Sequence, residues 1–500
     1  MRRGLLGVLA WAWAVSASGA TIYVNNLAGD DALDGLSATV ADGSGPVASI
    51  ERAFALVKTS DRVEIANTGV PYLRSYPGVR GRALVPAAGG TAENMLVVNG
   101  NGAVMSGLAA VPEDAWTAED GLLSLPFWPM SNQFKGYTQF DHWLDDTHIW
   151  WVDGKLAPNA HSLAELRATP GAFWWDRTNQ RVLFHKPADV PLADLRVEIP
   201  ANMGIYVHHD YTLVQDLVMI FSWNDGFDIA GAPKGVIFRR CISYHNCVQG
   251  FSCHGTGSAL YDECAAVNCA SSGACDVDWS NSIYRRCVFL TNTFEAGVYA
   301  HMESIHTFQD CLIVRNAPFE QIWQRGNSKM NLQNCVVVGR PGTSLVSLAS
   351  GSVAFQNCTL LDAERVAVLP EDGGGRITLE RCLVARMNES VLTLPASALA
   401  RLSLAGNAYV DVPGHRVADA VYNAANWAAL QEKQLENSSF WPEITLSGEL
   451  GATPSTPLQT VGPGDRARSV GAKLPEQVWA LYAWLQSHRP TPAGLVPDSR

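Results

Sequence analysis

Between residues 200 and 390 the chain repeats one short pattern of apolar and polar positions. A cysteine opens each repeat, apolar and often β-branched residues follow it, and a polar residue ends the run, as in CISYHN and CLIVRN. The cysteines lie 23 or 24 residues apart and are Cys241, Cys264, Cys287, Cys311, Cys335, Cys358 and Cys382. A fixed period in this range is typical of one supersecondary unit stacked many times. Because the leucine pattern of leucine-rich repeats is missing and short strands dominate, we predict an all-β fold in which each repeat is one coil of a right-handed parallel β-helix, a solenoid.

The pattern differs on both sides of these coils. Residues 1–20 carry two arginines, an apolar stretch and a small-residue end, which is typical of a secretory signal peptide cut after Ala20. Residues 113–199 break the period and are rich in tryptophan and in hairpin-like stretches. The predicted segments are a signal peptide (1–20), an N-terminal cap with a capping helix and the first coils (21–112), a β-rich insertion (113–199), regular β-helix coils (200–390), and the last coils with a C-terminal wrap (391–500).

Composition and charge exclude several classes of protein. Of 500 residues, 47% are hydrophobic and 17% are charged, which is typical of an ordered protein. The formal net charge of −12 argues against a nucleic-acid partner. Once the signal peptide is removed, no stretch is long and apolar enough to span a membrane. We therefore expect a secreted, periplasmic or extracellular protein that is a monomer.

Eleven cysteines in an exported chain suggest disulfides, but their odd number leaves at least one without an intramolecular partner. Stacked coils lie about 4.8 Å apart, which is within disulfide reach, yet cysteines in register can equally pack as small buried hydrophobic side chains. We favour a buried, mostly reduced ladder. A metal site made by this ladder is disfavoured, because metal ligands converge on one point and each layer supplies one thiol.

Functional residues must lie on outward positions, because inward side chains fill the core of a β-helix. Side chains alternate between the two faces of a strand, so aligning one strand of successive coils predicts three outward columns, although the coil of Cys264 differs in length by a residue. The first column is Asp228, Ser252, Ala274, Tyr299 and Trp323, the second is His254, Asp276, His301 and Arg325, and the third is Thr256, Asp278, Glu303 and Asn327.

These columns bring carboxylates and histidines together. Like charges on adjacent rungs cost stability unless a ligand binds or a proton is shared. Glycoside hydrolysis needs two carboxyl groups across the scissile bond, so we predict a glycoside hydrolase that works in an open groove. The predicted catalytic residues are Asp276, Asp278, Glu303 and His301. The predicted substrate-binding residues are Asp228, His254, Glu295, Tyr299, Trp323 and Arg325.

Two other functions stay open. A polysaccharide lyase acting on a uronate needs a base and a group that neutralises the carboxylate. Calcium between Asp276, Asp278 and Glu303 would supply that group, with Arg325 or His301 as the base. Apart from this calcium no metal or cofactor is expected. A non-catalytic adhesin or glycan-binding β-helix is the third alternative, because solenoids present extended binding surfaces.

Two acidic turns outside the columns have a simpler interpretation. Asp30, Asp31 and Asp34 lie in an Asp/Gly-rich stretch, where a solvated turn is favoured over a calcium site. The stretch Trp223-Asn224-Asp225-Gly226 is typical of a tight turn at the edge of the groove, with Asp225 as a second choice for a site residue.

Three stretches carry a resemblance to a known family: TIYVNN with GDDALDG near the N-terminus, the Cys and Asn repeat, and the SVGA segment near the C-terminus. On these the chain resembles secreted right-handed parallel β-helix proteins of the pectate-lyase-like superfamily. The resemblance implies a polysaccharide or oligosaccharide as the substrate. The polygalacturonase Asn-x-Asp and Gly-His-Gly motifs and a clear pectate-lyase arginine motif are missing, so no catalytic residue is carried over.

Overall fold

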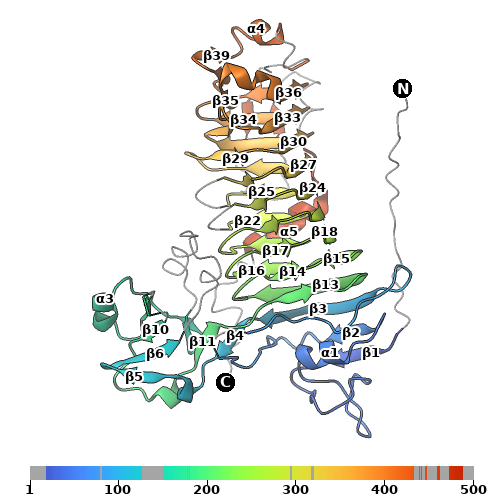
Figure 1. Ribbon diagram of the computed structural model, residues 1–500, viewed down its shortest axis with the longest axis vertical. Coiled ribbons are helices and arrows are strands. Elements are labelled where there is room, and N and C mark those ends of the chain that lie inside the picture. The colour runs from blue at the N-terminus through green and yellow to red at the C-terminus, as the bar shows by residue number, and fades with distance from the viewer. Residues whose placement is uncertain are drawn as a thin grey trace.

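The coils stack into one long solenoid (Figure 1). The computed structural model describes residues 19–78, 81–126, 150–176, 178–179, 181–292, 296–316, 320–432, 438–439, 441, 445–447, 459–461 and 472–487. Strands pair in parallel with the strand one coil away, as β18 (Ser258–Asp262) does with β21 (Asn281–Arg285). The predicted all-β parallel β-helix is therefore confirmed, with an N-terminal helix and a β-rich insertion beside it. The predicted signal peptide lies almost wholly outside the described residues.

Each regular coil contributes one strand to each of three faces. The first face consists of β1 (Thr21–Val24), β2 (Arg62–Ile65), β15 (Val236–Arg239), β18, β21, β24 (Ile305–Gln309), β27 (Lys329–Gln333), β30 (Ser352–Gln356), β33 (Arg376–Glu380) and β36 (Leu402–Ala405). The second face consists of β16 (Ile242–Tyr244), β19 (Ala265–Val267), β22 (Val288–Leu290), β25 (Leu312–Val314), β28 (Val336–Val338), β31 (Thr359–Ala363), β34 (Leu383–Met387) and β37 (Ala408–Val410). The long strands β3 (Leu96–Ser106) and β13 (Thr212–Ile220) run through both faces.

The third face is a separate sheet of eleven strands. It consists of β12 (Ile205–Val207), β14 (Phe227–Ile229), β17 (Phe251–Cys253), β20 (Ala274–Asp276), β23 (Val298–Ala300), β26 (Ile322–Gln324), β29 (Ser344–Leu348), β32 (Arg365–Val368), β35 (Leu392–Leu394), β38 (His415–Val417) and β39 (Ala420–Tyr422). All of its pairings except β38 with β39 are parallel, so the outward side chains of successive coils stand in columns.

The cysteine ladder lies at the corner between the first and second faces. The residue before each of its seven cysteines has a positive φ of 50–57°, which bends the chain there. All seven thiols are fully buried, which confirms their predicted place in the core. Their sulfurs contact backbone carbonyls one coil away, as Cys287 Sγ does at 3.4 Å from Tyr261 O. The ladder therefore fills a layer of the core and satisfies local carbonyl groups.

A second corner, between the second and third faces, is fixed by buried asparagines. Asn292 Oδ1 accepts from Cys269 N at 3.0 Å, and Asn292 Nδ2 donates to Ala266 O at 3.2 Å. Asn316 repeats this arrangement one coil later, where its Nδ2 donates to Phe289 O at 3.0 Å. Each side chain thus satisfies backbone groups of the preceding coil, which explains why asparagine ends the apolar run in the sequence.

The insertion folds into two small antiparallel sheets beside the first coils. One contains β4 (Leu108–Ala110), β11 (Val197–Pro200), β7 (Trp151–Val152) and β8 (Lys155–Leu156), and the other contains β5 (Thr117–Glu119), β6 (Leu122–Pro126), β10 (Arg181–Phe184) and β9 (Phe173–Asp176). Helix α3 (Leu163–Ala168) packs on the second sheet. Trp150, Trp151 and Trp175 are buried, so these tryptophans form a core and are not available to a sugar.

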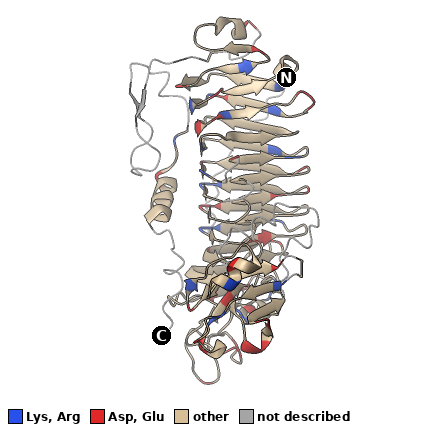
Figure 2. Ribbon diagram, turned by 90° about the vertical axis from the view of Figure 1, so that its left-hand side faces the viewer, with Lys and Arg blue, Asp and Glu red and all other residues tan. Residues whose placement is uncertain are grey.

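Short helices lie near both ends of the described part of the chain. Helix α1 (Ile50–Leu56) buries Ile50, Ala53 and Phe54 in the core at the N-terminal end. Near the C-terminus come α4 (Ala428–Gln431), the antiparallel pair of β40 (Thr445–Ser447) and β41 (Gln459–Val461), and α5 (Glu476–Ser487). Helix α5 packs on the outside of the second face. None of the helices in the described ranges has the length and hydropathy needed to cross a membrane. Basic and acidic residues are interspersed along the solenoid (Figure 2).

The burial of the cysteines predicts how they react. We expect a soluble thiol reagent to label none of the eleven cysteines quickly in the native protein, because all are buried, and to label eleven after denaturation without reductant. Counting thiols by absorbance in both states tests this. A count below eleven in the denatured, unreduced protein would show that disulfides form within the ladder.

His245 predicts an acid-sensitive contact between the insertion and the solenoid. Trp151 of the insertion packs with its ring tilted against that of Phe221, at 5.2 Å between ring centroids, and the Phe221 ring stacks on His245 at 5.8 Å. Burial lowers the pKa of His245 to about 4. Because the unfolded chain takes up this proton near pH 6.5, the folded state has its full stability above that pH and loses it as the pH falls towards 4.

We therefore expect His245→Gln to reduce the loss of stability between pH 7 and pH 4.5 by on the order of 2 kcal/mol. Urea unfolding at the two pH values measures this. His161→Gln, at an exposed histidine of the insertion, is the matched control and should leave the loss unchanged. An equal loss in the wild type and in His245→Gln would contradict the assignment.

Candidate functional site

The third face carries the outward columns on which chemistry can occur. Its middle column runs through Tyr206, Asp228, Ser252, Cys275, Tyr299 and Trp323. The next outward column, just past the strand ends, runs through His254, Val277, His301 and Arg325. The predicted register is thus correct on four coils and wrong by one residue on β20, where Cys253 pairs with Asp276 and not with Cys275.

This shift moves Asp276 into the core. Its side chain is fully buried, Tyr284 Oη donates to Asp276 Oδ1 at 2.8 Å, and His306 Nδ1 lies 3.6 Å from Asp276 Oδ2. The prediction that Asp276 faces outward between His254 and His301 is therefore wrong, because Val277 has that position. A group sealed in the core cannot touch a polysaccharide, so the catalytic role predicted for Asp276 has no geometric support.

The other two predicted carboxylates lie on the turn that follows the third face. Asp278 has a φ of 62° and its Oδ2 accepts from Gly255 N at 2.9 Å. Glu303 is exposed, and its Oε1 accepts from Asn327 Nδ2 at 2.8 Å. Within the described ranges, Asp276, Asp278 and Glu303 do not form a group able to share one metal ion. The predicted three-carboxylate centre, with its calcium, is not assembled.

A glycine column could have given the correct register. Gly226, Gly250, Gly273 and Gly297 stand one coil apart, before β14, β17, β20 and β23. A Cβ at Gly273 would lie 2.7 Å from Asn292 Nδ2, and one at Gly297 would lie 2.6 Å from Asn316 Nδ2. Only glycine fits where the chain passes the buried asparagines, so aligning Gly273 with Gly250 sets the register that aligning Ala274 misses.

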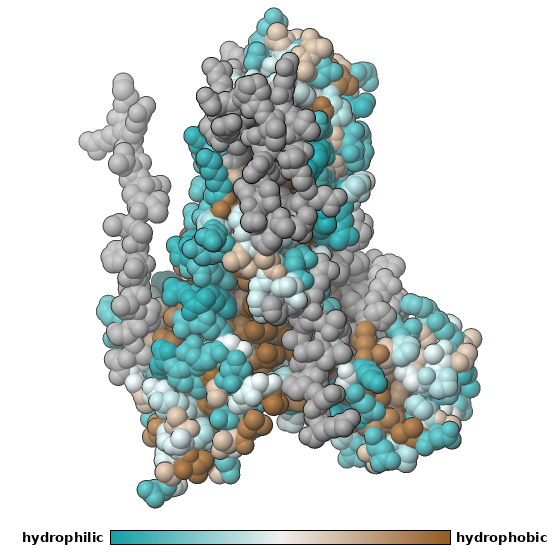
Figure 3. Space-filling view, turned by 180° about the vertical axis from the view of Figure 1, so that it is seen from behind, coloured by the Kyte–Doolittle hydropathy of each residue, from teal (hydrophilic) through white to brown (hydrophobic). Residues whose placement is uncertain are grey.

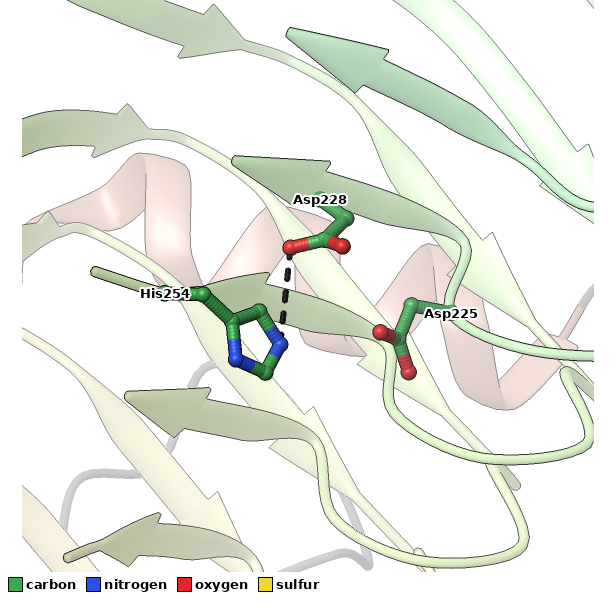
Figure 4. Close-up of side chains that lie close together, drawn as sticks. All are labelled: Asp225, Asp228 and His254. Atoms are coloured by element: carbon green, nitrogen blue, oxygen red, sulfur yellow. Dashed lines mark ion pairs between the residues drawn. The ribbon is translucent and has the colours of Figure 1, made fainter. Parts of the chain in front are cut away.

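The structure brings together three side chains at the start of the third face (Figure 4). Asp225 lies in the turn before β14, Asp228 on β14, and His254 directly after β17. Their potential ligand atoms all lie within 4.8 Å of one another, and His254 Nε2 is 3.7 Å from Asp228 Oδ1. We call this group, with the adjacent Asn224, the Asp228 site. Two predicted substrate-binding residues and the second-choice Asp225 therefore converge.

The carboxylates of the Asp228 site are almost completely buried, with each residue 2% exposed. Burial, followed by the negative charge of Asp225, raises the pKa of Asp228 well above its ordinary value. Burial also lowers the pKa of His254. Asp225 accepts from Gln249 N at 3.0 Å. Asp228 Oδ1 and Asn224 Oδ1 have no hydrogen-bond donor among the described residues, so the site presents buried acceptors that a cation or a proton would satisfy.

The Asp228 site is not a serine-hydrolase triad. Ser252 Oγ lies 2.7 Å from His254 Nε2, which is also the nitrogen that faces Asp228. A Ser-His-Asp triad needs the serine and the carboxylate on opposite ring nitrogens. The second nitrogen, Nδ1, points away from both aspartates (Figure 4). This arrangement leaves Nδ1 free for a substrate.

Aromatic and basic side chains continue the outward columns three coils further on. The rings of Tyr299 and Trp323 are 5.3 Å apart, and the guanidinium of Arg325 lies 4.5 Å from the centre of the Trp323 ring. His301 stacks on Tyr299 at 6.1 Å. We call Tyr299, Trp323, His301 and Arg325 the aromatic row. It starts three strand spacings, about 14 Å, from the strand of Asp228. Glu295, also predicted to bind substrate, lies outside the described residues.

Comparison with known proteins agrees with the fold. Residues 203–360 match the family model of the right handed beta helix region. The structure of the pectate lyase Pel9A is similar, with 11% identity, 92% of this chain and 97% of that chain covered, and a TM-score of 0.52. A structure described as a glycoside hydrolase has 9% identity, covers 91% of this chain and 99% of that chain, and has a TM-score of 0.46. No curated protein sequence matches the chain. The family match and the likeness to the pectate lyase agree with a right-handed β-helix and show the fold alone.

Proposed function

We propose that this right-handed β-helix protein is a secreted carbohydrate-active enzyme that cleaves a uronate-containing polysaccharide by β-elimination at the Asp228 site. The proposal rests on the buried oxygen Asp228 Oδ1, which has no donor among the described residues and lies beside the carboxylate of Asp225. Hydrolysis was favoured by the sequence because three carboxylates were expected on one outward face, and that group is not assembled. The similar fold of a pectate lyase agrees with elimination.

A divalent cation fits the Asp228 site. Asp225 and Asp228 offer carboxylate oxygens, the ligands that calcium prefers. Isolated buried carboxylates are costly unless they are paired or bind a metal. When bound, the cation would neutralise the carboxylate of the substrate uronate and so acidify the proton on C5.

His254 is the side chain positioned to take the C5 proton. Its side chain is 39% exposed, whereas that of Asp228 behind it is 3% exposed. When Nε2 carries the ring proton and faces Ser252, Nδ1 is the free acceptor. The C5–H electron pair then forms the double bond between C4 and C5, the C4–O bond breaks, and the leaving oxygen takes a proton from water. His254 therefore acts as the base in this mechanism.

The aromatic row holds the sugars that follow the cleaved bond. Trp323 and Tyr299 are partly exposed and present flat apolar surfaces. Arg325, held over Trp323, is placed to donate to a sugar carboxylate or hydroxyl. His301 lies two strand spacings, about 10 Å, from His254. We therefore assign His301 to substrate binding and not to proton transfer.

Hydrolysis stays a second candidate because of one observation. Two carboxylates lie together at Asp225 and Asp228, and burial raises the pKa of Asp228, as a general acid requires. In that mechanism Asp228 protonates the leaving oxygen and Asp225 acts as nucleophile or base. Products without unsaturated, ultraviolet-absorbing ends but with new reducing ends would favour hydrolysis over elimination.

Cation binding can be tested without any substrate. We expect calcium or manganese at about 100 times its Kd to stabilise the chelator-treated protein by about 2.7 kcal/mol, seen as a rise in Tm. Asp228→Asn should abolish this rise because it removes the buried carboxylate, whereas Glu303→Gln, which changes an exposed carboxylate, should keep it. A rise of the same size in Asp228→Asn would place the cation elsewhere.

Activity measurements on variants show whether the reaction occurs at the Asp228 site or at the carboxylates that were predicted from the sequence. On a panel of uronate polysaccharides we expect unsaturated products from the wild type, and a loss of about 10²–10⁴-fold in kcat for His254→Ala. Arg325→Ala should raise KM more than it lowers kcat, because it contacts the substrate away from the cleaved bond. Formation of the double bond is followed by ultraviolet absorbance.

Asp278→Asn and Glu303→Gln are the matched controls, since both carboxylates are hydrogen-bonded on the following turn. They should keep activity within a few-fold of the wild type. If these two variants lose activity while His254→Ala keeps it, the reaction belongs to the turn and not to the Asp228 site. Binding of glycans without any cleavage product would instead favour the adhesin alternative.

A further inference from the structure

A cavity of about 400 Å³ lies at the N-terminal end of the first face, in a different sheet from the Asp228 site. Its lining includes Tyr23, Ala38, Pro46, Arg62, Glu64 and Asn101. Tyr23 and Glu64 are directly paired on β1 and β2, and both point outward. Seen from behind, hydrophilic residues form a band along the left edge of the solenoid above the N-terminal cap (Figure 3).

One wall of the cavity is apolar and held in place. It contains Ala38 and Pro46, which belong to the loop between β1 and α1. The carboxylate of Asp31 accepts from Ala48 N at 2.9 Å and Ser49 N at 2.8 Å, and Asp34 accepts from Leu36 N at 2.9 Å. The carboxylates of Asp31 and Asp34 thus hold the loop in its conformation by accepting hydrogen bonds from its own backbone amides. These hydrogen bonds hold the wall in place before any ligand arrives, which lowers the entropy cost of binding.

The opposite wall is polar and has no excess charge. Arg62 Nε donates to Glu64 Oε1. Glu64 Oε2 accepts from Asn99 Nδ2 at 2.9 Å and Asn101 Nδ2 at 2.8 Å. The terminal nitrogens of Arg62 make no hydrogen bond with the described residues and remain available as a pair of donors. Because Glu64 balances the charge of Arg62, this wall suits hydroxyl groups better than a carboxylate.

We propose that this cavity is a second sugar-binding site, selective for a neutral sugar residue and separate from the proposed catalytic site. A pyranose ring has an apolar face of C–H groups and an edge of hydroxyls. Ala38, Pro46 and the ring of Tyr23 match the face, and the terminal nitrogens of Arg62 match the edge. The site lets the protein hold a neutral glycan with one face of the solenoid while another face is free.

Calorimetric titration with xylohexaose and cellohexaose, and with trigalacturonate as the charged probe, tests the proposal. We expect at least one neutral oligosaccharide to bind the wild type, and Arg62→Gln and Tyr23→Ala each to weaken it by at least tenfold. Gln333→Ala, at an exposed position on the same face, is the matched control and should bind as the wild type does. Thermal unfolding confirms that each variant is folded.

Trp323→Ala separates this cavity from the aromatic row. It should keep the neutral ligand at full affinity while weakening trigalacturonate. If the neutral ligand is lost in Trp323→Ala and kept in Arg62→Gln, binding belongs to the aromatic row and the proposal is overturned. Absence of binding by both neutral oligosaccharides overturns it equally. Neither outcome depends on whether the Asp228 site eliminates or hydrolyses its substrate.

Discussion

The in-register pairing of each strand with the strand one coil away determines which side chains fill the core and which face solvent. Side chains alternate between core and solvent along a strand, so a slip of one residue exchanges the two sets. On β20 that exchange decides whether Asp276 or Cys275 faces a substrate, and the pairing of Cys253 with Asp276 buries the carboxylate. The strand register therefore determines which residues of the sequence can contact a substrate.

Register itself is fixed by close contacts at the corners. The buried asparagines bond the backbone of the preceding coil, and the chain passes them at glycines because no Cβ fits there. The cysteine ladder fills the other corner, and the residue before each of its seven cysteines bends with a positive φ. Both corners thus place polar or polarisable side chains in the core.

These constraints explain how far the sequence could be interpreted. The period of the cysteines predicts the β-helix, the buried ladder and most of the outward columns, including Asp228, His254, Tyr299, Trp323 and Arg325. It fails for Asp276 because aligning Ala274 in place of Gly273 shifts β20 by one residue. Alternation alone cannot show that Tyr284 and His306 lie in the core beside that carboxylate. It also gives Asp225 little weight, since only the folded turn brings that carboxylate beside Asp228.

Two buried aspartates on the same sheet show what separates structure from function here. Asp228 Oδ1 and Asp276 Oδ2 both lack a hydrogen-bond donor in the described part of the chain, and each has a histidine nitrogen within 4 Å. Missing donors alone therefore do not identify a site. The histidine beside Asp276 is fully buried, whereas His254 is open to solvent, and only Asp228 has a second carboxylate close by. Access and a second negative charge are what a cation and a sugar require, and those two features favour Asp228 over Asp276 as the centre of chemistry.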